Sequence, residues 1–291
     1  MANAMFTREQ LEVLASFLDD ARALYAAQVV PPHPDFEQPA AAEQLINDFI
    51  RNETHGKIVD LIHNVDPDTA LILVNYIFLK AKWETPFDPD DTIESRFYLS
   101  KSRSVQVPMM KAEDLTVPYL RDEALSCTVV ELKYLGNASA LLILPDRGKM
   151  QPVEAELLPE TLARWRNNLK PRFINELYMP KFSISGSCDL QKILPQMGIR
   201  EAFSTQGDLS GITTRQQLEV TQVVHRALLD VAEEGTEAAA AHGMKSMTVS
   251  GRLNPTILQY DRPFLMNIYD KTSDTILFLG KVANPSQSQS S

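Results

Sequence analysis

The segment between Val231 and Tyr260 is the part of the chain whose residue types and spacing point to chemistry. It begins with the small-residue run EEGTEAAAA at 233–241 and continues through 242–254 with neither helical nor strand periodicity, until Pro255 precedes the next predicted strand. A connection of this length without a pattern of its own is unusual in a compact domain and is usually functional or disordered. It is therefore the candidate functional segment.

Small residues without proline suit a segment that enters a β-sheet as an added strand. Insertion would give each backbone group a partner, while alternate side chains would have to fit beneath the sheet. Glu237 should face outward, because a carboxylate in a dry core is costly. That phase places Thr236, Ala238, Ala240 and His242 inward, and His242 fits least well. The alternative is a short alanine-rich helix, which composition alone favours because Glu and Ala are strong helix formers.

Mostly strands with scattered helices are predicted around this segment. Strands are predicted over 70–83, 128–134, 140–144, 174–184, 220–231, 256–260, 264–269 and 275–282. Helices are predicted over 7–30 (with Thr7 and Gln10 as a capping box), 40–52, 150–169 and 190–197. This order indicates an α+β protein of large mixed sheets rather than repeated βαβ units. No linker is visible, so a single domain over 1–285 is expected, followed by a low-complexity tail at 286–291.

The charge and hydropathy of the chain argue against nucleic-acid and membrane partners. Lys and Arg number 28 against 38 Asp and Glu, which gives a net charge of −10, spread rather than blocked. The basic patch at 101–103 is short, and we interpret it as a solvated turn. No apolar run reaches the length of a membrane span, because Asn75 interrupts the longest one.

Neither a metal site nor a catalytic centre is visible in the sequence. His33, His55 and His63 have no zinc spacing with one another or with cysteine, and no Ser or Cys is accompanied by a recognisable base or oxyanion motif. We expect no cofactor, no metal and no enzymatic activity. Cys127 and Cys188 could form a disulfide, but two unpaired buried thiols are the favoured interpretation.

Two glycosylation sequons hint at secretion. Asn52 stands in Asn-Glu-Thr and Asn137 in Asn-Ala-Ser, and both are predicted glycosylation sites. Residues 1–5 have neither a basic stretch nor an apolar signal core, so a secreted protein would have its signal peptide outside this chain.

Several motifs together resemble the serpin family. Residues 233–241 look like the hinge of an inhibitory serpin's reactive-centre loop, and 260–265 (YDRPFL) resemble the family's C-terminal signature. Further similar segments are 75–83 (NYIFLKAKW), 107–110 (VPMM), 127–134 (CTVVELKY), 177–184 (LYMPKFSI) and 278–285 (FLGKVANP). Within the family, the likeness is to clade A members of the antichymotrypsin-like kind. It runs from about Asn3 to Pro285.

The resemblance implies a fold and a mechanism. The fold would be serpin-like α+β, with large mixed β-sheets, surrounding helices and a long exposed reactive-centre loop at about 233–255. The protein would be a suicide-substrate inhibitor of a serine protease. The protease would form an acyl-enzyme with the loop. The cleaved loop would then insert into the main sheet before deacylation, as an added strand whose insertion releases stored strain.

The resemblance also implies which loop residues act. The hinge would consist of Glu233, Glu234, Gly235, Thr236, Glu237, Ala238, Ala239, Ala240 and Ala241. Counting along the loop as in the family places the reactive bond at Val249–Ser250, with 247–248 and 252–253 as alternatives. A small β-branched residue before the bond suits an elastase-like protease, whereas a chymotrypsin-like protease would favour a larger one.

Three further residues match positions in the main sheet of serpins. Asn75 and His225 match the shutter, where strands part for insertion, although a polar residue in a strand is most often only a satisfied core or surface group. Trp83 matches the breach, where insertion begins, although large aromatics are usually only core.

The chain also departs from the family pattern at its start. Roughly a quarter of the family's domain, including N-terminal helices, has no counterpart, so the chain is expected to be N-terminally truncated. Two alternatives to an inhibitor follow: a non-inhibitory carrier of a small hydrophobic hormone, or a truncated product without activity. We expect a secreted protein that acts outside the cell.

Overall fold

The chain forms two compact units, which are described separately. The structure is a computed structural model, and it describes residues 2–8, 11–30, 34–79, 81–204, 207–213, 220–234 and 255–286. The first unit comprises Met1–Leu79 and Ser185–Leu229, and the second comprises Lys80–Ile184 and Asp230–Ser290. The sequence expectation of a single domain over 1–285 remains a prediction.

A five-stranded sheet organises the first unit, in the order β2-β1-β3-β10-β9. Its strands are β1 (Ala2–Thr7), β2 (Ala27–Val29), β3 (Leu71–Phe78), β9 (Phe182–Asp189) and β10 (Gln222–Val231). Strand β3 lies antiparallel to β1 and parallel to β10. β3 and β10, although far apart in the sequence, are therefore neighbours in the sheet.

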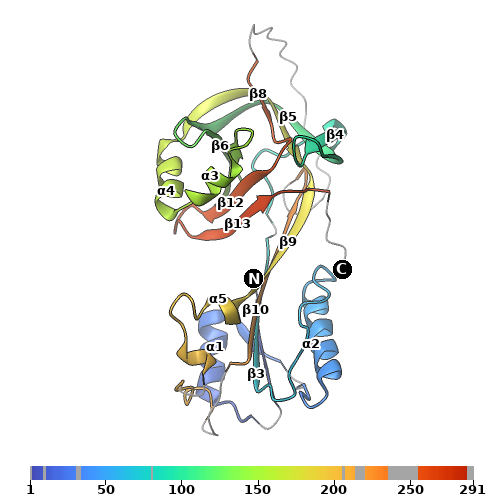
Figure 1. The fold of residues 1–291 in the computed structure, drawn as a ribbon, viewed down its shortest axis with the longest axis vertical. Coiled ribbons are helices and arrows are strands. Elements are labelled where there is room, and N and C mark those ends of the chain that lie inside the picture. The colour runs from blue at the N-terminus through green and yellow to red at the C-terminus, as the bar shows by residue number, and fades with distance from the viewer. Residues whose placement is uncertain are drawn as a thin grey trace. The chain divides into compact units, whose positions relative to one another are not determined.

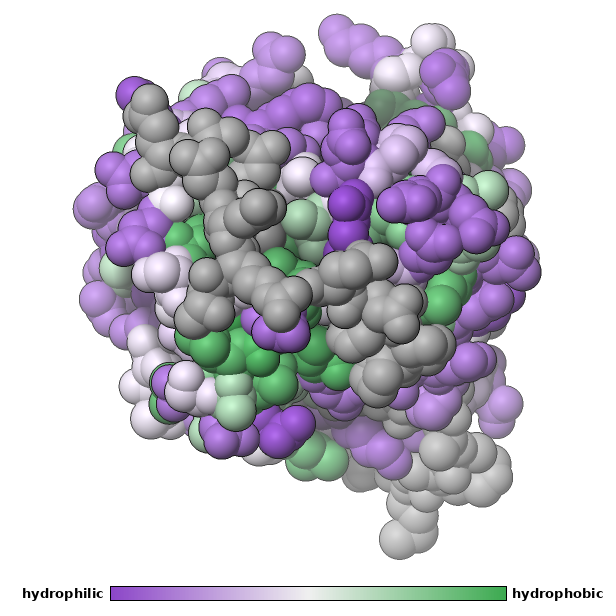
Figure 2. All heavy atoms as spheres, turned by 90° about the horizontal axis from the view of Figure 1, so that it is seen from below, coloured by the Kyte–Doolittle hydropathy of each residue, from purple (hydrophilic) through white to green (hydrophobic). Residues whose placement is uncertain are grey.

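Helices pack against this sheet. They are α1 (Ala15–Tyr25), α2 (Pro39–Glu53), α5 (Leu190–Ile193) and the 3-10 turn η2 (Glu201–Phe203) (Figure 1). The apolar stripe of α2 is buried, with Ile46 and Ile50 packed in one cluster with Phe6, Ile72 and Val74. In contrast, α1 buries no residue completely. Figure 2 shows hydrophobic residues gathered on the end of the molecule that it views.

An eight-stranded sheet organises the second unit, in the order β11-β8-β5-β6-β7-β12-β13, with β4 paired to β5. The strands are β4 (Ile93–Tyr98), β5 (Ser104–Asp122), β6 (Cys127–Lys133), β7 (Ala138–Pro145), β8 (Lys170–Pro180), β11 (Ile257–Gln259), β12 (Phe264–Asp270) and β13 (Ile276–Val282). Helices α3 (Met150–Ala155) and α4 (Pro159–Asn168) cover one face, with Val153, Leu162 and Trp165 in the core (Figure 1). The 3-10 turn η1 (Pro89–Asp91) precedes β4.

The predicted helix over 7–30 is wrong at both ends. Thr7 is the last residue of β1 rather than a helix cap, the helix begins only at Ala15, and Ala27–Val29 form β2. Strand β1 owes its conformation to pairing with β3, far along the chain. Tertiary pairing of this kind overrides a local helical pattern. The prediction over 40–52 is confirmed by α2.

Proline explains the other differences from the predicted elements. The predicted helix over 150–169 is divided into α3 and α4, and Pro159 starts the second. The predicted strand over 174–184 is two strands that separate after Pro180. Strand β5 was not predicted, and it contains Pro108 and Pro118, which weaken a strand pattern. Cys188 is exposed and only Cys127 is buried, so the prediction of two buried thiols is half wrong; both are unpaired.

Candidate functional site

The backbone that leads into the candidate segment is fixed at its first residues. After β10 ends at Val231, the carbonyl groups of the next three residues all accept hydrogen bonds. Trp83 Nε1 donates to Ala232 O at 3.0 Å. The backbone N–H of Phe87 donates to Glu233 O at 2.8 Å, and that of Trp83 donates to Glu234 O at 2.8 Å. The start of the segment is therefore held on a platform made by residues 83–87.

The carboxylate of Glu233 is buried and fully engaged. Its side chain belongs to a residue only 7% exposed. Thr92 Oγ1 donates to Oε1 at 3.0 Å, and Lys181 Nζ lies 3.0 Å from Oε2. Burial alone would raise the pKa of this carboxyl, but hydrogen bonds from its own backbone N–H, Lys181 and Thr92 outweigh burial and leave the pKa below its usual value. Glu233 is therefore an ionised anchor.

Glu234 carries a second buried carboxylate beside the first. The residue is 7% exposed, and its Oε2 lies 3.7 Å from Nζ of Lys82. Both predicted hinge glutamates thus lie beside lysines. Lys181, between β8 and β9, pairs with Glu233, and Lys82, directly before Trp83, pairs with Glu234. Because an unpaired buried charge is costly, these pairs oppose displacement of the segment.

Trp83 is the centre of this platform. It is 2% exposed, and its ring stacks on Tyr134 with centroids 4.1 Å apart and an interplanar angle of 12°. Phe87 packs against it edge to face at 6.4 Å. Stacked and edge-to-face aromatic pairs are favourable beyond the area that they bury. Trp83 therefore both packs in the core and donates to the segment, and its assignment to the breach stays a prediction.

Asn75 and His225 lie together in the sheet of the first unit. They are paired in register across β3 and β10, and His225 Nδ1 lies 2.5 Å from Asn75 Oδ1. On the other side, Asn75 Nδ2 donates to Asn3 Oδ1 at 2.5 Å, and Asn3 is the register partner of Asn75 on β1. Burial lowers the pKa of His225, which favours the neutral ring. The polar chain links three adjacent strands.

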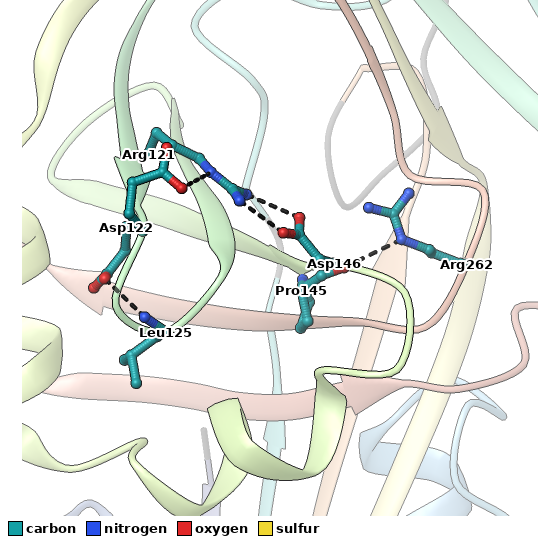
Figure 3. Close-up of polar contacts among 7 residues, drawn as sticks. Arg121, Asp122, Leu125, Pro145, Asp146 and Arg262 are labelled. Atoms are coloured by element: carbon teal, nitrogen blue, oxygen red, sulfur yellow. Dashed lines mark hydrogen bonds and ion pairs between the residues drawn. The ribbon is translucent and has the colours of Figure 1, made fainter.

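A separate polar cluster in the second unit is structural (Figure 3). Arg121 binds the carboxylate of Asp146 through two hydrogen bonds, at 2.8 and 2.6 Å, and Arg262 Nε donates to Pro145 O at 3.1 Å. Nearby Cys127 is not a nucleophile, because burial raises its pKa to about 12. This cluster fixes the turn after β7 and the chain after β11.

Of the remaining predicted site residues, the structure describes the two glycosylation asparagines but not the rest of the hinge or the reactive bond. Asn52 is exposed in α2, and Asn137 precedes β7 with its Nδ2 donating to Asp270 Oδ2 at 2.9 Å. The rest of the predicted hinge, Gly235–Ala241, and the predicted reactive bond, Val249 and Ser250, lie outside the described residues. The described residues contain no group of three or more His, Cys, Asp and Glu suited to a metal, and no helix among them is long and apolar enough to cross a membrane.

Sequence reasoning missed the partners that hold the glutamates. Thr92, Lys82 and Lys181 come from separate parts of the chain, with Thr92 141 positions from Glu233. Lys181 stands in the motif 177–184 that carried the family resemblance, but its type and position do not reveal that it pairs with Glu233. Asn3 was likewise missed, and only its register opposite Asn75 identifies it.

The chain is similar to known proteins along nearly its whole length. The model of the family "Serpin (serine protease inhibitor)" matches residues 1–285. The chain is 57% identical to serine protease inhibitor A3N of Rattus norvegicus, over 97% of the chain and 67% of that protein. It is also 57% identical to alpha-1-antichymotrypsin of Homo sapiens, over 99% of the chain and 68% of that protein.

Solved structures of two other proteins have a fold similar to that of this chain. Human thyroxine-binding globulin in complex with thyroxine matches with a TM-score of 0.88 and 41% identity, over 98% of this chain and 74% of that one. Human glycosylated kallistatin matches with a TM-score of 0.87 and 43% identity, over 98% and 74% of the two chains.

Proposed function

This chain belongs to the serpin (serine protease inhibitor) family, and we propose that it inhibits its target protease as a suicide substrate, with the reactive bond at Val249–Ser250. The protease serine attacks the carbonyl carbon of Val249. An ester to the protease forms as the amide bond breaks, and the amine of Ser250 leaves. Residues 235–249 then insert between β3 and β10 as an added strand.

The observation that carries the proposal is the buried anchoring of Glu233. Its ion pair with Lys181 at 3.0 Å, together with the carbonyl contacts of the same backbone, holds the chain directly before the small-residue run. A hinge needs such a fixed point, because the chain after it turns while the chain before it stays in place.

Insertion would be favourable on a scale that can distort a bound enzyme. About ten added backbone hydrogen bonds at about 1 kcal/mol each amount to about 10 kcal/mol. Asn75 and His225 would be the groups that part when the strand enters, because their contact crosses the β3–β10 pair. We assign them the shutter role on this basis.

The valine before the reactive bond favours an elastase-like protease. A restricted primary pocket accepts valine, whereas a chymotrypsin-like pocket selects a larger side chain. Relatives named for chymotrypsin make that class the second candidate. We also propose that the protein is secreted and carries glycans on Asn52 and Asn137, with the two sequons as support.

The test is to mix the protein with neutrophil elastase and, separately, with chymotrypsin, and to look for a covalent complex that survives denaturing electrophoresis. We expect a complex with elastase. Mass spectrometry should show that the released C-terminal peptide begins at Ser250. Elastase with its serine chemically blocked is the control and should give no complex. Cleavage without a complex for both proteases would contradict inhibition of these two classes.

A further inference from the structure

The side chain of Asn175 holds the chain at the C-terminal side of the candidate segment. Asn175 Oδ1 accepts a hydrogen bond from the backbone N–H of Thr256 at 2.9 Å. In return, the backbone N–H of Asn175 donates to Thr256 O at 2.9 Å. The two residues thus form a closed pair of hydrogen bonds, in which one acceptor is a side chain.

This pair lies where the sheet begins to hold the chain after the loop. Strand β11 spans only Ile257–Gln259, pairs with β8 in parallel, and is the edge strand of its sheet. Beyond it, the N–H of Tyr260 donates to Tyr178 O at 2.9 Å. Since so short a strand has few ladder hydrogen bonds, a side-chain hydrogen bond to the residue directly before it is a large share of what keeps it attached.

We propose that Asn175 is a positioning residue that keeps the intact loop from inserting before a protease has cut it. This rests on the proposed function. An intact loop is attached at both ends, so its insertion beside β3 would pull on Thr256 and remove β11 from β8. A cut loop is free of that constraint, because its C-terminal part stays on β8. The side chain of Asn175 therefore acts before cleavage and not after it.

The chain offers a matched pair of variants. Asn175→Ala removes the side-chain acceptor and leaves the backbone N–H of Asn175 in place. Thr256→Val is the control, because the hydrogen bonds of Thr256 seen among the described residues use only its backbone atoms. An aspartate at 175 is a poorer choice, since Glu113, Asp114 and Glu176 line the same shallow pocket and would repel it.

Hydrogen exchange of the peptide that contains 255–260 tests the contact itself. Asn175→Ala should speed exchange of the Thr256 amide about fivefold, as expected for one lost hydrogen bond, and Thr256→Val should match the unaltered protein. Unchanged exchange in Asn175→Ala, or an equal increase in Thr256→Val, would overturn the role of the side chain. This measurement does not depend on inhibition, so it separates the inference from the proposed function.

Inhibition assays test the consequence. On storage without protease, Asn175→Ala should lose inhibitory activity about fivefold faster than Thr256→Val, with the loop still intact by mass. Immediately after purification, both variants should require the same number of inhibitor molecules per protease inhibited. The proposal that Asn175 acts only before cleavage would be overturned by either of two results. One is that Asn175→Ala loses inhibitory activity on storage no faster than Thr256→Val. The other is that fresh Asn175→Ala requires a different number of inhibitor molecules per protease inhibited. If the unaltered protein forms no complex, the proposed function fails instead.

Discussion

Nζ of Lys181 lies 3.0 Å from Oε2 of Glu233, and this contact joins the connection between β8 and β9 to the chain that follows β10. The lysine side chain is 43% exposed and the glutamate side chain 9%. The pair is therefore asymmetric: the lysine keeps water contact, and the glutamate depends on its partners. Removing the cation leaves a buried carboxylate, which is the costlier loss.

Lys181→Met should lower the free energy of unfolding by about 1 kcal/mol, because Thr92 and the backbone still bind Glu233 and the exposed lysine is partly screened. Thermal unfolding monitored by circular dichroism provides the measurement. Lys192→Met is the matched control, since its ion pair with Asp189 is exposed on both sides. A control that destabilises as much as Lys181→Met would contradict the importance of burial at Glu233.

Stability should depend on the protonation of His225. Partial burial lowers its pKa from the ordinary histidine value of 6.5, so the folded protein binds this proton less readily than the unfolded chain. The stabilising contribution is then complete above about pH 6.5 and is lost as the pH falls from there toward the lowered folded pKa.

This effect can be isolated with His225→Gln, which cannot titrate. The decrease in melting temperature between about pH 7 and about pH 5 should be smaller in this variant than in the unaltered protein. His55→Gln, at an exposed position, is the control. Equal pH slopes for His225→Gln and the unaltered protein would contradict a half-buried neutral histidine at this position.

The sequence predicted elements whose signals are local. Helix α2 followed from an amphipathic stripe, and β10, β12 and β13 from apolar β-rich runs. The strand over Ala2–Thr7 was not predicted from the sequence, because it forms through pairing with β3, and a local pattern does not indicate so distant a partner. Elements of this kind need contact information that spacing does not provide.

The same distinction applies to the candidate site. The family motifs identified Glu233, Trp83, Asn75 and His225, which the structure places in hydrogen-bonded contacts. They could not identify Lys181 as the partner of Glu233. Ion-pair partners are determined by three-dimensional proximity, and a lysine is ordinarily a solvated residue.

The sequon at Asn52 allows glycosylation and stability to be separated. Thr54 is buried, its Oγ1 donates to Ile50 O at 2.8 Å, and it accepts from the N–H of Ile58 at 3.0 Å. In a secreting host, Asn52→Gln and Thr54→Val should both lose the glycan. Only Thr54→Val should also lose about 1 kcal/mol of stability, because it leaves buried backbone groups without this hydroxyl.

Enzymatic deglycosylation followed by mass spectrometry measures the glycan, and thermal unfolding measures the stability. Thr54→Ser is the conservative control, since it keeps both the sequon and the hydroxyl. A loss of stability in Asn52→Gln equal to that in Thr54→Val would contradict a separate structural role for the Thr54 hydroxyl.

The phase of the hinge can be tested by placing one large charge at two neighbouring positions. The sequence predicts that Thr236 faces inward and Glu237 outward when the loop inserts. Thr236→Arg would force an unpaired cation beneath the sheet, which costs several kcal/mol. Since about 1.4 kcal/mol is a factor of ten in rate, insertion should then be slower than deacylation, and the covalent complex should fall at least about tenfold.

Glu237→Arg is the matched control and should retain the yield of complex, because the same side chain would remain in water. Both variants should still be cut at the reactive bond, since cleavage precedes insertion. Denaturing electrophoresis after reaction with elastase measures complex and cleaved inhibitor together. If Glu237→Arg abolishes the complex and Thr236→Arg does not, the alternation is shifted by one residue; if neither does, these residues do not enter the sheet.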